Sequence, residues 1–140
     1  RSNPSDAGLD IYAHLKEKIE IAPGANKMIP TGLRFGIPHG YMLQVCNRSS
    51  MGAKRSLVVG AHIIDSGYDG EVFIDLHNIG ADTQTIITGD KVAQLILVPA
   101  ATTNLYENQG LTISERGSGA LGSTDNSIPH PLNGHPSGGF

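Results

Sequence analysis

The chain has 140 residues, the size of one domain with a modest core, and its formal net charge is −3. This charge argues against binding to nucleic acid by charge alone, although local donors could still hold an anionic ligand. No apolar run approaches the ~20 residues that span a membrane. Cys46 is the single cysteine, which excludes an intramolecular disulfide and a thiolate zinc cluster. We therefore expect a protein of the reducing cytoplasm.

Glycine and proline divide the sequence into short segments, and helix signals are scarce. Several segments alternate apolar and polar side chains with the period of two that is typical of half-exposed strands. In chain order we expect strands within 8–13 and at 18–22, 27–30, 41–46, 56–59, 71–76, 84–88 and 92–98. One short helical turn is expected at 49–54. This pattern predicts an all-β domain, either a sandwich, a jelly roll or a small barrel.

The chain changes character near residue 116. From there to residue 140 it is rich in glycine and proline and holds few apolar side chains. Such a composition is typical of a lid or tail and not of a core. We therefore expect a β domain at 1–115 and a flexible lid or tail at 116–140.

The stretch VVGAHIIDSGYDGEV, residues 58–72, is the first candidate site. Asp65 closes an apolar run, and a half-shielded carboxylate at a strand end can accept a proton from a nucleophilic water. The turn at Gly67 would let the ring of Tyr68 fold back toward a flat ligand or a sugar. The alternative is an ordinary hairpin loop, because Asp, Ser and Gly are common turn residues.

Two further stretches could hold phosphate. Arg48, Ser49 and Ser50 combine an arginine fork with two hydroxyl groups, although the alternative is a capped helical turn. Residues 116–124 resemble G-x-G-x-x-G but lack the lysine of a P-loop, so they read either as a polyphosphate-wrapping strand or as a linker. The histidines lack the spacing of metal ligands, and any divalent ion would be carried by phosphate.

Together these stretches resemble the trimeric dUTPases, a family with five ordered motifs. The matching stretches are AGLDI at 7–11, RSSMG at 48–52, residues 60–71, GDKVAQLI at 89–96, and residues 116–124. The resemblance implies a distorted jelly roll and a homotrimer whose active sites each draw on neighbouring subunits. It also implies hydrolysis of dUTP to dUMP and pyrophosphate, which lowers dUTP and supplies dUMP for thymidylate synthesis. Mg²⁺ would be held by the triphosphate and waters, and a viral or phage chain would act inside its host.

The resemblance also implies a role for individual residues. Asp65 would orient and deprotonate the attacking water, and Asp10 would act through water or by structure. Tyr68 would pack under the deoxyribose. The uracil would be read by a hairpin slot formed by Ala61, His62, Ile63, Ile64 and, on the return strand, Phe73. Phosphates would be held by Arg48, Ser49, Ser50 and Gln94, and the lid would close with Arg116, Gly122, Ser123 and Thr124.

The chain departs from the family pattern at three places. Asn47 stands where a proline is usual, and Ala120 and Leu121 replace a glycine and the aromatic that stacks on uracil. Leu121 would still cover the base, and we expect the tail to loop back so that Phe140 supplies the ring. The alternative is that the tail is a disordered extension. Asp75 stands where the related dCTP deaminases carry a catalytic glutamate, so deamination is an alternative. A binding or regulatory protein on the same scaffold is another.

Overall fold

The computed structural model describes residues 3–107, 110, 114 and 117–119. The chain divides into two compact units, 1–103 and 104–140, and the elements described below belong to the first. Within the described residues, no helix has the length and apolar character needed to cross a membrane. The expected lid at 116–140 lies almost wholly outside the described residues.

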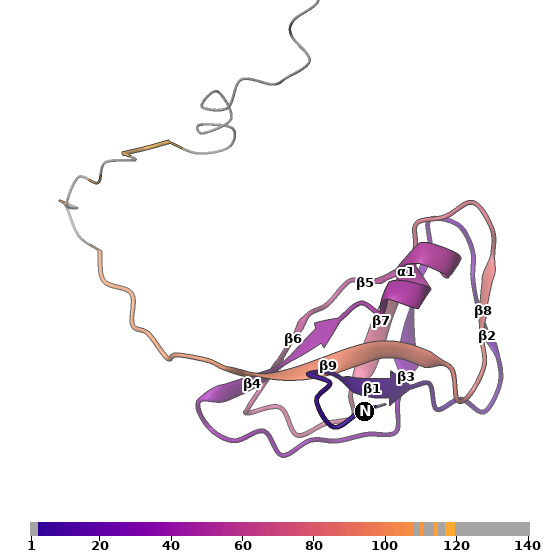
Figure 1. Cartoon of the computed structure of the whole chain (residues 1–140), viewed down its shortest axis with the longest axis horizontal. Coiled ribbons are helices and arrows are strands. Elements are labelled where there is room, and N and C mark those ends of the chain that lie inside the picture. The colour runs from indigo at the N-terminus through magenta and orange to yellow at the C-terminus, as the bar shows by residue number, and fades with distance from the viewer. Residues whose placement is uncertain (1–2, 108–109, 111–113, 115–116, 120–140) are drawn as a thin grey trace, which may run out of the picture. The chain divides into compact units, whose positions relative to one another are not determined.

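The first unit is built from short strands and one short helix (Figure 1). Each expected strand has a counterpart, and the helical turn is present with one residue more than expected. In chain order the elements are β1 (Leu9–Tyr12), β2 (Ile19–Ile21), β3 (Asn26–Pro30), β4 (Tyr41–Cys46), α1 (Ser49–Arg55), β5 (Leu57–Val59), β6 (Ile63–Asp65), β7 (Phe73–Asn78), β8 (Gln84–Ile86) and β9 (Lys91–Pro99).

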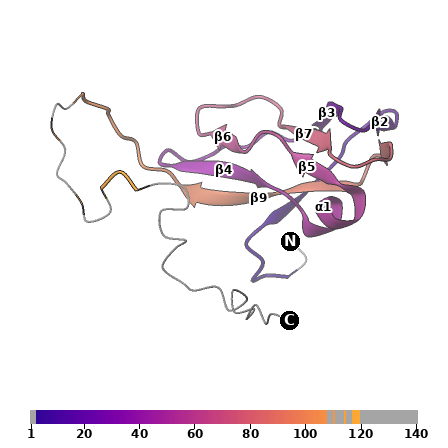
Figure 2. The same cartoon turned by 90° about the horizontal axis from the view of Figure 1, so that it is seen from above.

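These strands form three antiparallel sheets. The first has the order β1-β9-β4-β6, the second β3-β7-β5, and the third pairs β2 with β8. Figure 2 shows β4 and β9 side by side in the first sheet. Buried side chains from all three sheets form one core cluster, which confirms the predicted all-β class. Its members are Ile11, Ala13, Ile21, Ile29, Ile37, Leu43, Val45, Met51, Leu57, Val59, Val72, Ile74, Leu76, Ile86, Val92, Ala93 and Leu95.

The expected hairpin around 58–72 is present as the antiparallel pair β5–β7, but its connecting segment also forms β6, a strand that the sequence pattern did not predict. β5 pairs with β7, from Leu57 opposite Asn78 to Val59 opposite Leu76. After Gly60 the chain leaves β5, and β6 pairs instead with β4 in the other sheet. Segment 66–72 then returns to β7. The loop that carries Asp65 therefore bridges the two main sheets, and its shape depends on both.

A bulge in the pairing of β1 with β9 decides which side chains face outward. Ile11 lies opposite Ala93, but the next residue of β1, Tyr12, lies opposite Lys91. Val92 is thus an extra residue, and both Val92 and Ala93 are buried. Two inward residues in a row place Lys91 and Gln94 on the same outer face of β9.

Candidate functional site

A pocket of about 250 Å³ lies where the two main sheets meet at the 58–72 segment. It brings together five residues to which the resemblance assigned base or sugar recognition, and the expected catalytic residue Asp65. The five are Ala61, Ile63, Ile64, Tyr68 and Phe73. Ile63 is 62% exposed and Phe73 44% exposed, so apolar surface faces the opening. Hence this hollow can take a small flat ligand. We call it the base pocket.

Sequence reasoning missed four other residues of the base pocket. Met28, Val45, Glu71 and Val72 also line it. Met28 arrives from β3, whose pairing with β7 no local pattern could show. His62, in contrast, does not line the pocket. Its carbonyl accepts the Val45 N–H at 2.8 Å and its Nδ1 lies 3.2 Å from the Val45 carbonyl oxygen, so it ties β6 to β4.

Asp65 and Tyr68 lie on one tight turn at the end of β6. The Tyr68 N–H donates to the Asp65 carbonyl at 3.1 Å, and the Tyr68 hydroxyl donates to the Glu71 carbonyl at 2.5 Å. The tyrosine ring thus folds back along the loop, as the Gly67 turn predicted. The Asp65 side chain is exposed and also borders a smaller hollow beside Tyr41 and Thr102. This arrangement leaves the carboxylate open to water.

A second, more polar pocket of about 430 Å³ lies at the other end of the first sheet. It includes Asp10, Arg48, Ser49 and Gln94 of the predicted site, and it is completed by Asp6, Ala7, Gly8 and Ile96. Ser50, the next residue of α1, does not line it. We call it the phosphate pocket, after the ligand that its arginine and hydroxyl suit.

The serines at the start of α1 do not make the capping hydrogen bond that a capped helical turn would require. The N-cap is Arg48, in an extended conformation and without a side-chain capping hydrogen bond. Within the described part of the chain, the hydroxyls of Ser49 and Ser50 make no hydrogen bond to the protein. They therefore remain available to a ligand.

Asp10 is held by two cations at the wall of the phosphate pocket. Its carboxylate lies 3.0 Å from Lys91 Nζ and 3.1 Å from Arg48 Nε. The hydrogen bond from Lys91, together with the charges of Arg48 and Lys91, outweighs burial and lowers the pKa of Asp10. The same hydrogen bond raises the pKa of Lys91. Asp10 thus orients Arg48. The sequence pattern did not identify Lys91 as a residue of the site.

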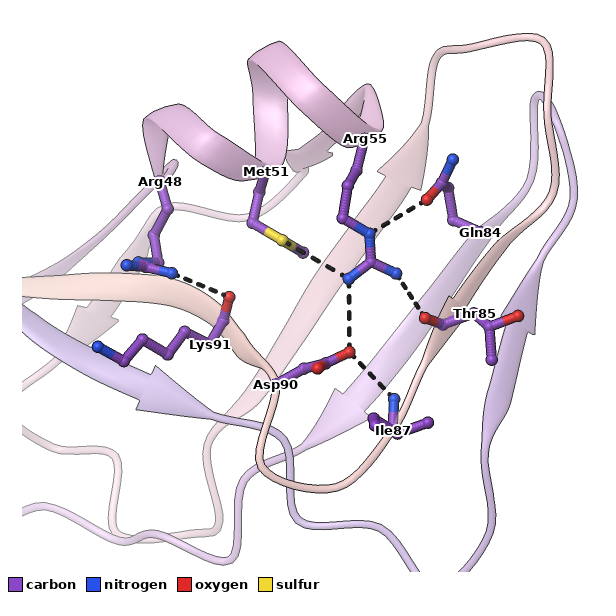
Figure 3. Close-up of polar contacts among 8 residues, drawn as sticks. All are labelled: Arg48, Met51, Arg55, Gln84, Thr85, Ile87, Asp90 and Lys91. Atoms are coloured by element: carbon purple, nitrogen blue, oxygen red, sulfur yellow. Dashed lines mark hydrogen bonds and ion pairs between the residues drawn. The ribbon is translucent and has the colours of Figure 1, made fainter.

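Arginines at both ends of α1 attach the helix to the start of β9 (Figure 3). Arg48 donates to the Lys91 carbonyl at 3.4 Å. Arg55 lies 3.4 Å from the Asp90 carboxylate, donates to the Gln84 side chain at 3.1 Å and also reaches the Thr85 carbonyl. Since Asp90 also accepts the Ile87 N–H, the guanidinium of Arg55 joins α1 to the turn between β8 and β9.

Gln94 completes the phosphate pocket from β9. Its side-chain nitrogen donates to the Asn47 carbonyl at 2.9 Å, just before Arg48. Its amide oxygen would lie 2.5 Å from a Cβ added at Gly8, so the amide rests on a bare backbone. Asn47, where the family pattern has a proline, accepts the Val59 N–H at 2.7 Å through its side chain. That contact ties the approach to α1 to β5.

Asp65 and Gln94 lie at opposite ends of one sheet face. Asp65 pairs with Met42 at the start of β4, and Gln94 pairs with Cys46 at its end. Four residues of strand span about 13 Å, and β6 and β9 flank β4 about 10 Å apart. A general base must lie within hydrogen-bond reach of the proton it takes, or one water away. Asp65 therefore cannot serve a phosphorus atom held in the phosphate pocket of its own chain.

Asp75 does not line the base pocket. Its carboxylate binds Asn26 and His77 on the outer face of the second sheet, each at 2.9 Å. Burial raises its pKa, but these hydrogen bonds outweigh burial and the net pKa is lowered. A deaminase glutamate would have to reach the base, so the placement of Asp75 gives no support to that alternative.

The described residues contain no group of three or more His, Cys, Asp or Glu side chains that could hold a metal ion. Six residues of the predicted site lie outside the described part of the chain. They are Arg116, Leu121, Gly122, Ser123, Thr124 and Phe140, and their roles stay predictions.

Comparison with known proteins gives one consistent result. A family model described as dUTPase matches residues 1–125. The deoxyuridine 5′-triphosphate nucleotidohydrolase of Gloeobacter violaceus is 38% identical over 125 residues, which cover 88% of this chain and 85% of that protein. The enzyme of the same name from Anaplasma marginale is 35% identical over 125 residues, with the same coverage.

Solved structures agree with this match. A variant of the dUTPase of Staphylococcus bacteriophage 80alpha with dUpNHpp superimposes with a TM-score of 0.82 at 27% identity, over 89% of each chain. A variant of the dUTPase from phage phi11 of S. aureus, with a structural Mg(II) ion, gives a TM-score of 0.72 at 28% identity, over 79% of this chain and 88% of that one. These likenesses confirm the predicted jelly-roll fold.

Proposed function

The chain belongs to the dUTPase family and is an enzyme that hydrolyses dUTP to dUMP and pyrophosphate, and we propose that three copies of the chain share each active site. One observation supports a site shared between copies: Asp65 and the phosphate pocket lie at opposite ends of the same sheet face. The number of three copies follows the resemblance to the trimeric dUTPases. A second copy that brings its phosphate pocket to the first copy's Asp65 removes the separation. Closed cyclic symmetry then repeats the contact at every subunit.

The base pocket supplies specificity in this proposal. Its apolar walls take uracil, and the backbone of 61–65 offers hydrogen-bonding groups to the base edge. A slot of this size rejects the methyl group of thymine by shape. The ring of Tyr68 packs under the sugar and leaves no room for a 2′-hydroxyl. Leu121 and Phe140 would cover the base from the lid.

The phosphate pocket and Asp65 supply the chemistry. Arg48, Ser49 and Gln94 hold the triphosphate, with Ser50 beside them, and Arg116, Gly122, Ser123 and Thr124 would close over its end. Asp65 accepts a proton from a water whose oxygen attacks the α-phosphorus. The bond to the bridging oxygen of the β-phosphate breaks, and that oxygen leaves with pyrophosphate. Positioning and preorganised donors lower the barrier.

We propose that magnesium enters as part of the substrate. The described residues offer no cluster for an all-protein cage, and Asp10 already has two cationic partners. A triphosphate and waters would supply the oxygen ligands that Mg²⁺ prefers. When bound, the ion would neutralise part of the phosphate charge, and Arg48 would contact phosphate oxygens.

The substrate assay compares pyrophosphate release from dUTP, dTTP, UTP and dCTP in the presence of magnesium. We expect release from dUTP alone, because dTTP carries the methyl, UTP the 2′-hydroxyl, and dCTP the wrong base edge. Equal turnover of UTP, or intact dUTP, would contradict the proposal. Ammonia from dCTP would point to the deaminase reaction instead.

The shared site is tested by co-expressing two inactive variants, Asp65→Asn and Arg48→Gln. If Asp65 and Arg48 of one site come from different copies, about a quarter of all sites in a randomly assembled equal mixture of the two variants hold both native residues. We expect activity near that fraction. Sites built within one chain would leave the mixture inactive, and this result would overturn the shared site without touching the substrate assignment.

A further inference from the structure

Asp75 and His77 form a pair on the outer face of β7. Along this strand Ile74, Leu76 and Asn78 are buried, so Phe73, Asp75 and His77 face away from the core. Asp75 Oδ2 lies 2.9 Å from His77 Nε2, and Asp75 Oδ1 accepts a hydrogen bond of 2.9 Å from the Asn26 side chain. The Asp75 side chain is only 17% exposed. Both carboxylate oxygens are therefore fixed.

The pair lies directly on Gly60. A Cβ added at Gly60 would be 2.5 Å from Asp75 Oδ2 and closer still to His77 Nε2. The Gly60 N–H also donates to the Asp75 carbonyl at 2.9 Å. Gly60 does not have a positive φ, so its backbone conformation is open to other residues. Glycine is required here because the pair occupies the space of a side chain.

Gly60 is the residue at which the chain leaves β5 for the other sheet. The next residue, Ala61, lines the base pocket, and so do Ile63 and Ile64. On the far side of Asp75, its strand partner Met28 lines the same pocket. Two walls of the pocket thus begin at residues that contact or pair with Asp75.

We propose that Asp75 and His77 are positioning residues for uracil recognition, which act by holding Gly60 and thereby the path of 61–64. Neither side chain lines the base pocket, so their effect passes through the backbone. The inference rests on the proposed function and deepens it. A displacement of the backbone at Gly60 would move the hydrogen-bonding groups of 61–64 that face the base.

The test measures base discrimination and phosphate affinity in the same variants. For Asp75→Ala and His77→Ala we expect KM for dUTP to rise about tenfold, which is the scale of one lost charged hydrogen bond. The ratio of kcat/KM for dUTP over dTTP should fall by a similar factor. Inhibition by pyrophosphate should not change, because the phosphate pocket lies on the other sheet. His77→Gln should recover most of the loss, since its amide can still donate to Asp75. Lys27→Ala, an exposed change on β3, is the matched control.

Gly60→Ala supplies a second, independent variant. Its added methyl should displace the pair and reproduce the loss of discrimination. In the Asp75→Ala/His77→Ala background the same methyl should have little further effect, because the space is then empty. Wild-type KM and discrimination in folded Asp75→Ala and His77→Ala would overturn the inference. So would a parallel loss of thermal stability and pyrophosphate affinity, which would show a purely structural pair. Either result leaves dUTP hydrolysis by the unchanged enzyme intact.

Discussion

Lys91 Nζ lies 3.0 Å from the Asp10 carboxylate, next to the bulge that interrupts the pairing of β1 with β9. Without the bulge, strict alternation would turn Lys91 and Gln94 to opposite faces. With it, both reach the outer face, where Asp10 lies opposite Gln94. The ion pair of Asp10 with Lys91 therefore lies with the Gln94 amide and with Arg48 at one wall of the phosphate pocket. One extra residue in β9 makes this geometry.

Acid should lower the stability of the folded enzyme through the protonation of Asp10. Its pKa is lowered on folding, so its contribution to stability is complete above the unfolded-state pKa of about 4. That contribution is lost as pH falls through the lower folded-state value. We measure the unfolding midpoint as a function of pH. In Asp10→Asn we expect the midpoint to fall less steeply as the pH is lowered. Asp75, whose pKa is also lowered, should account for another part.

Arg55→Met should weaken phosphate binding, although Arg55 does not line the phosphate pocket. The change removes the contacts to Asp90, Gln84 and Thr85 that join α1 to β8 and β9. Since the guanidinium is partly exposed, we expect a loss of about 1–2 kcal/mol in unfolding free energy. KM and the pyrophosphate inhibition constant should both rise. Arg55→Lys should recover little, because lysine lacks the planar fork.

The control for this prediction is Lys54→Met on the same helix. Lys54 is exposed and precedes Arg55, so the two variants lose the same charge. Chemical denaturation and inhibition by pyrophosphate are measured for both. Equal effects at the two positions would mean that net charge, and not the attachment of α1, explains the result.

Asp65→Asn should abolish turnover and keep substrate binding. An amide of the same shape cannot take a proton from water, and general-base catalysis contributes about 10²–10⁴ in rate. Single-turnover kinetics should show this loss in kcat. Calorimetric binding of dUpNHpp should stay within a few-fold of the native enzyme. A comparable fall in dUpNHpp affinity would assign Asp65 to binding instead.

Tyr68 should determine the choice between deoxyribose and ribose. Removing the ring in Tyr68→Ala opens the space under the sugar, so the kcat/KM ratio for dUTP over UTP should fall. Tyr68→Phe keeps the ring and loses only the hydroxyl bond to Glu71. We expect it to retain most of the discrimination. If Tyr68→Phe loses as much discrimination as Tyr68→Ala, the hydroxyl bond and not the ring sets the sugar preference.

Two changes compare Leu121 and Phe140 as the residue that is expected to cover uracil. Leu121→Ala removes an apolar side chain at the motif position, and deletion of 137–140 removes Phe140. If the tail supplies the stacking ring, deletion should raise KM more than Leu121→Ala does, because aromatic contacts exceed those of leucine. Unchanged kcat and KM after deletion would leave Leu121 as the cover.

The sequence by itself determined the local elements and which residue types gather in each pocket. Alternation and glycine punctuation predict β4 to the residue, and the turn at 49–54 is α1 shortened by one residue. Asp65 and Tyr68, and likewise Arg48 and Gln94, come together in their pockets as the motifs indicate. Such features depend on neighbours within a few positions, which a single sequence displays.

The tertiary structure decided which strands pair and which faces meet. Only it sends β6 to β4 instead of β7, places Met28 in the base pocket, and seats Asp75 on Gly60. Strand pairing joins residues far apart in the chain, and a bulge reverses the facing of everything beyond it. Period-two patterns carry neither the partner nor the bulge. The separation of Asp65 from Gln94, on which the proposed shared site rests, therefore emerges only when the sheet is assembled.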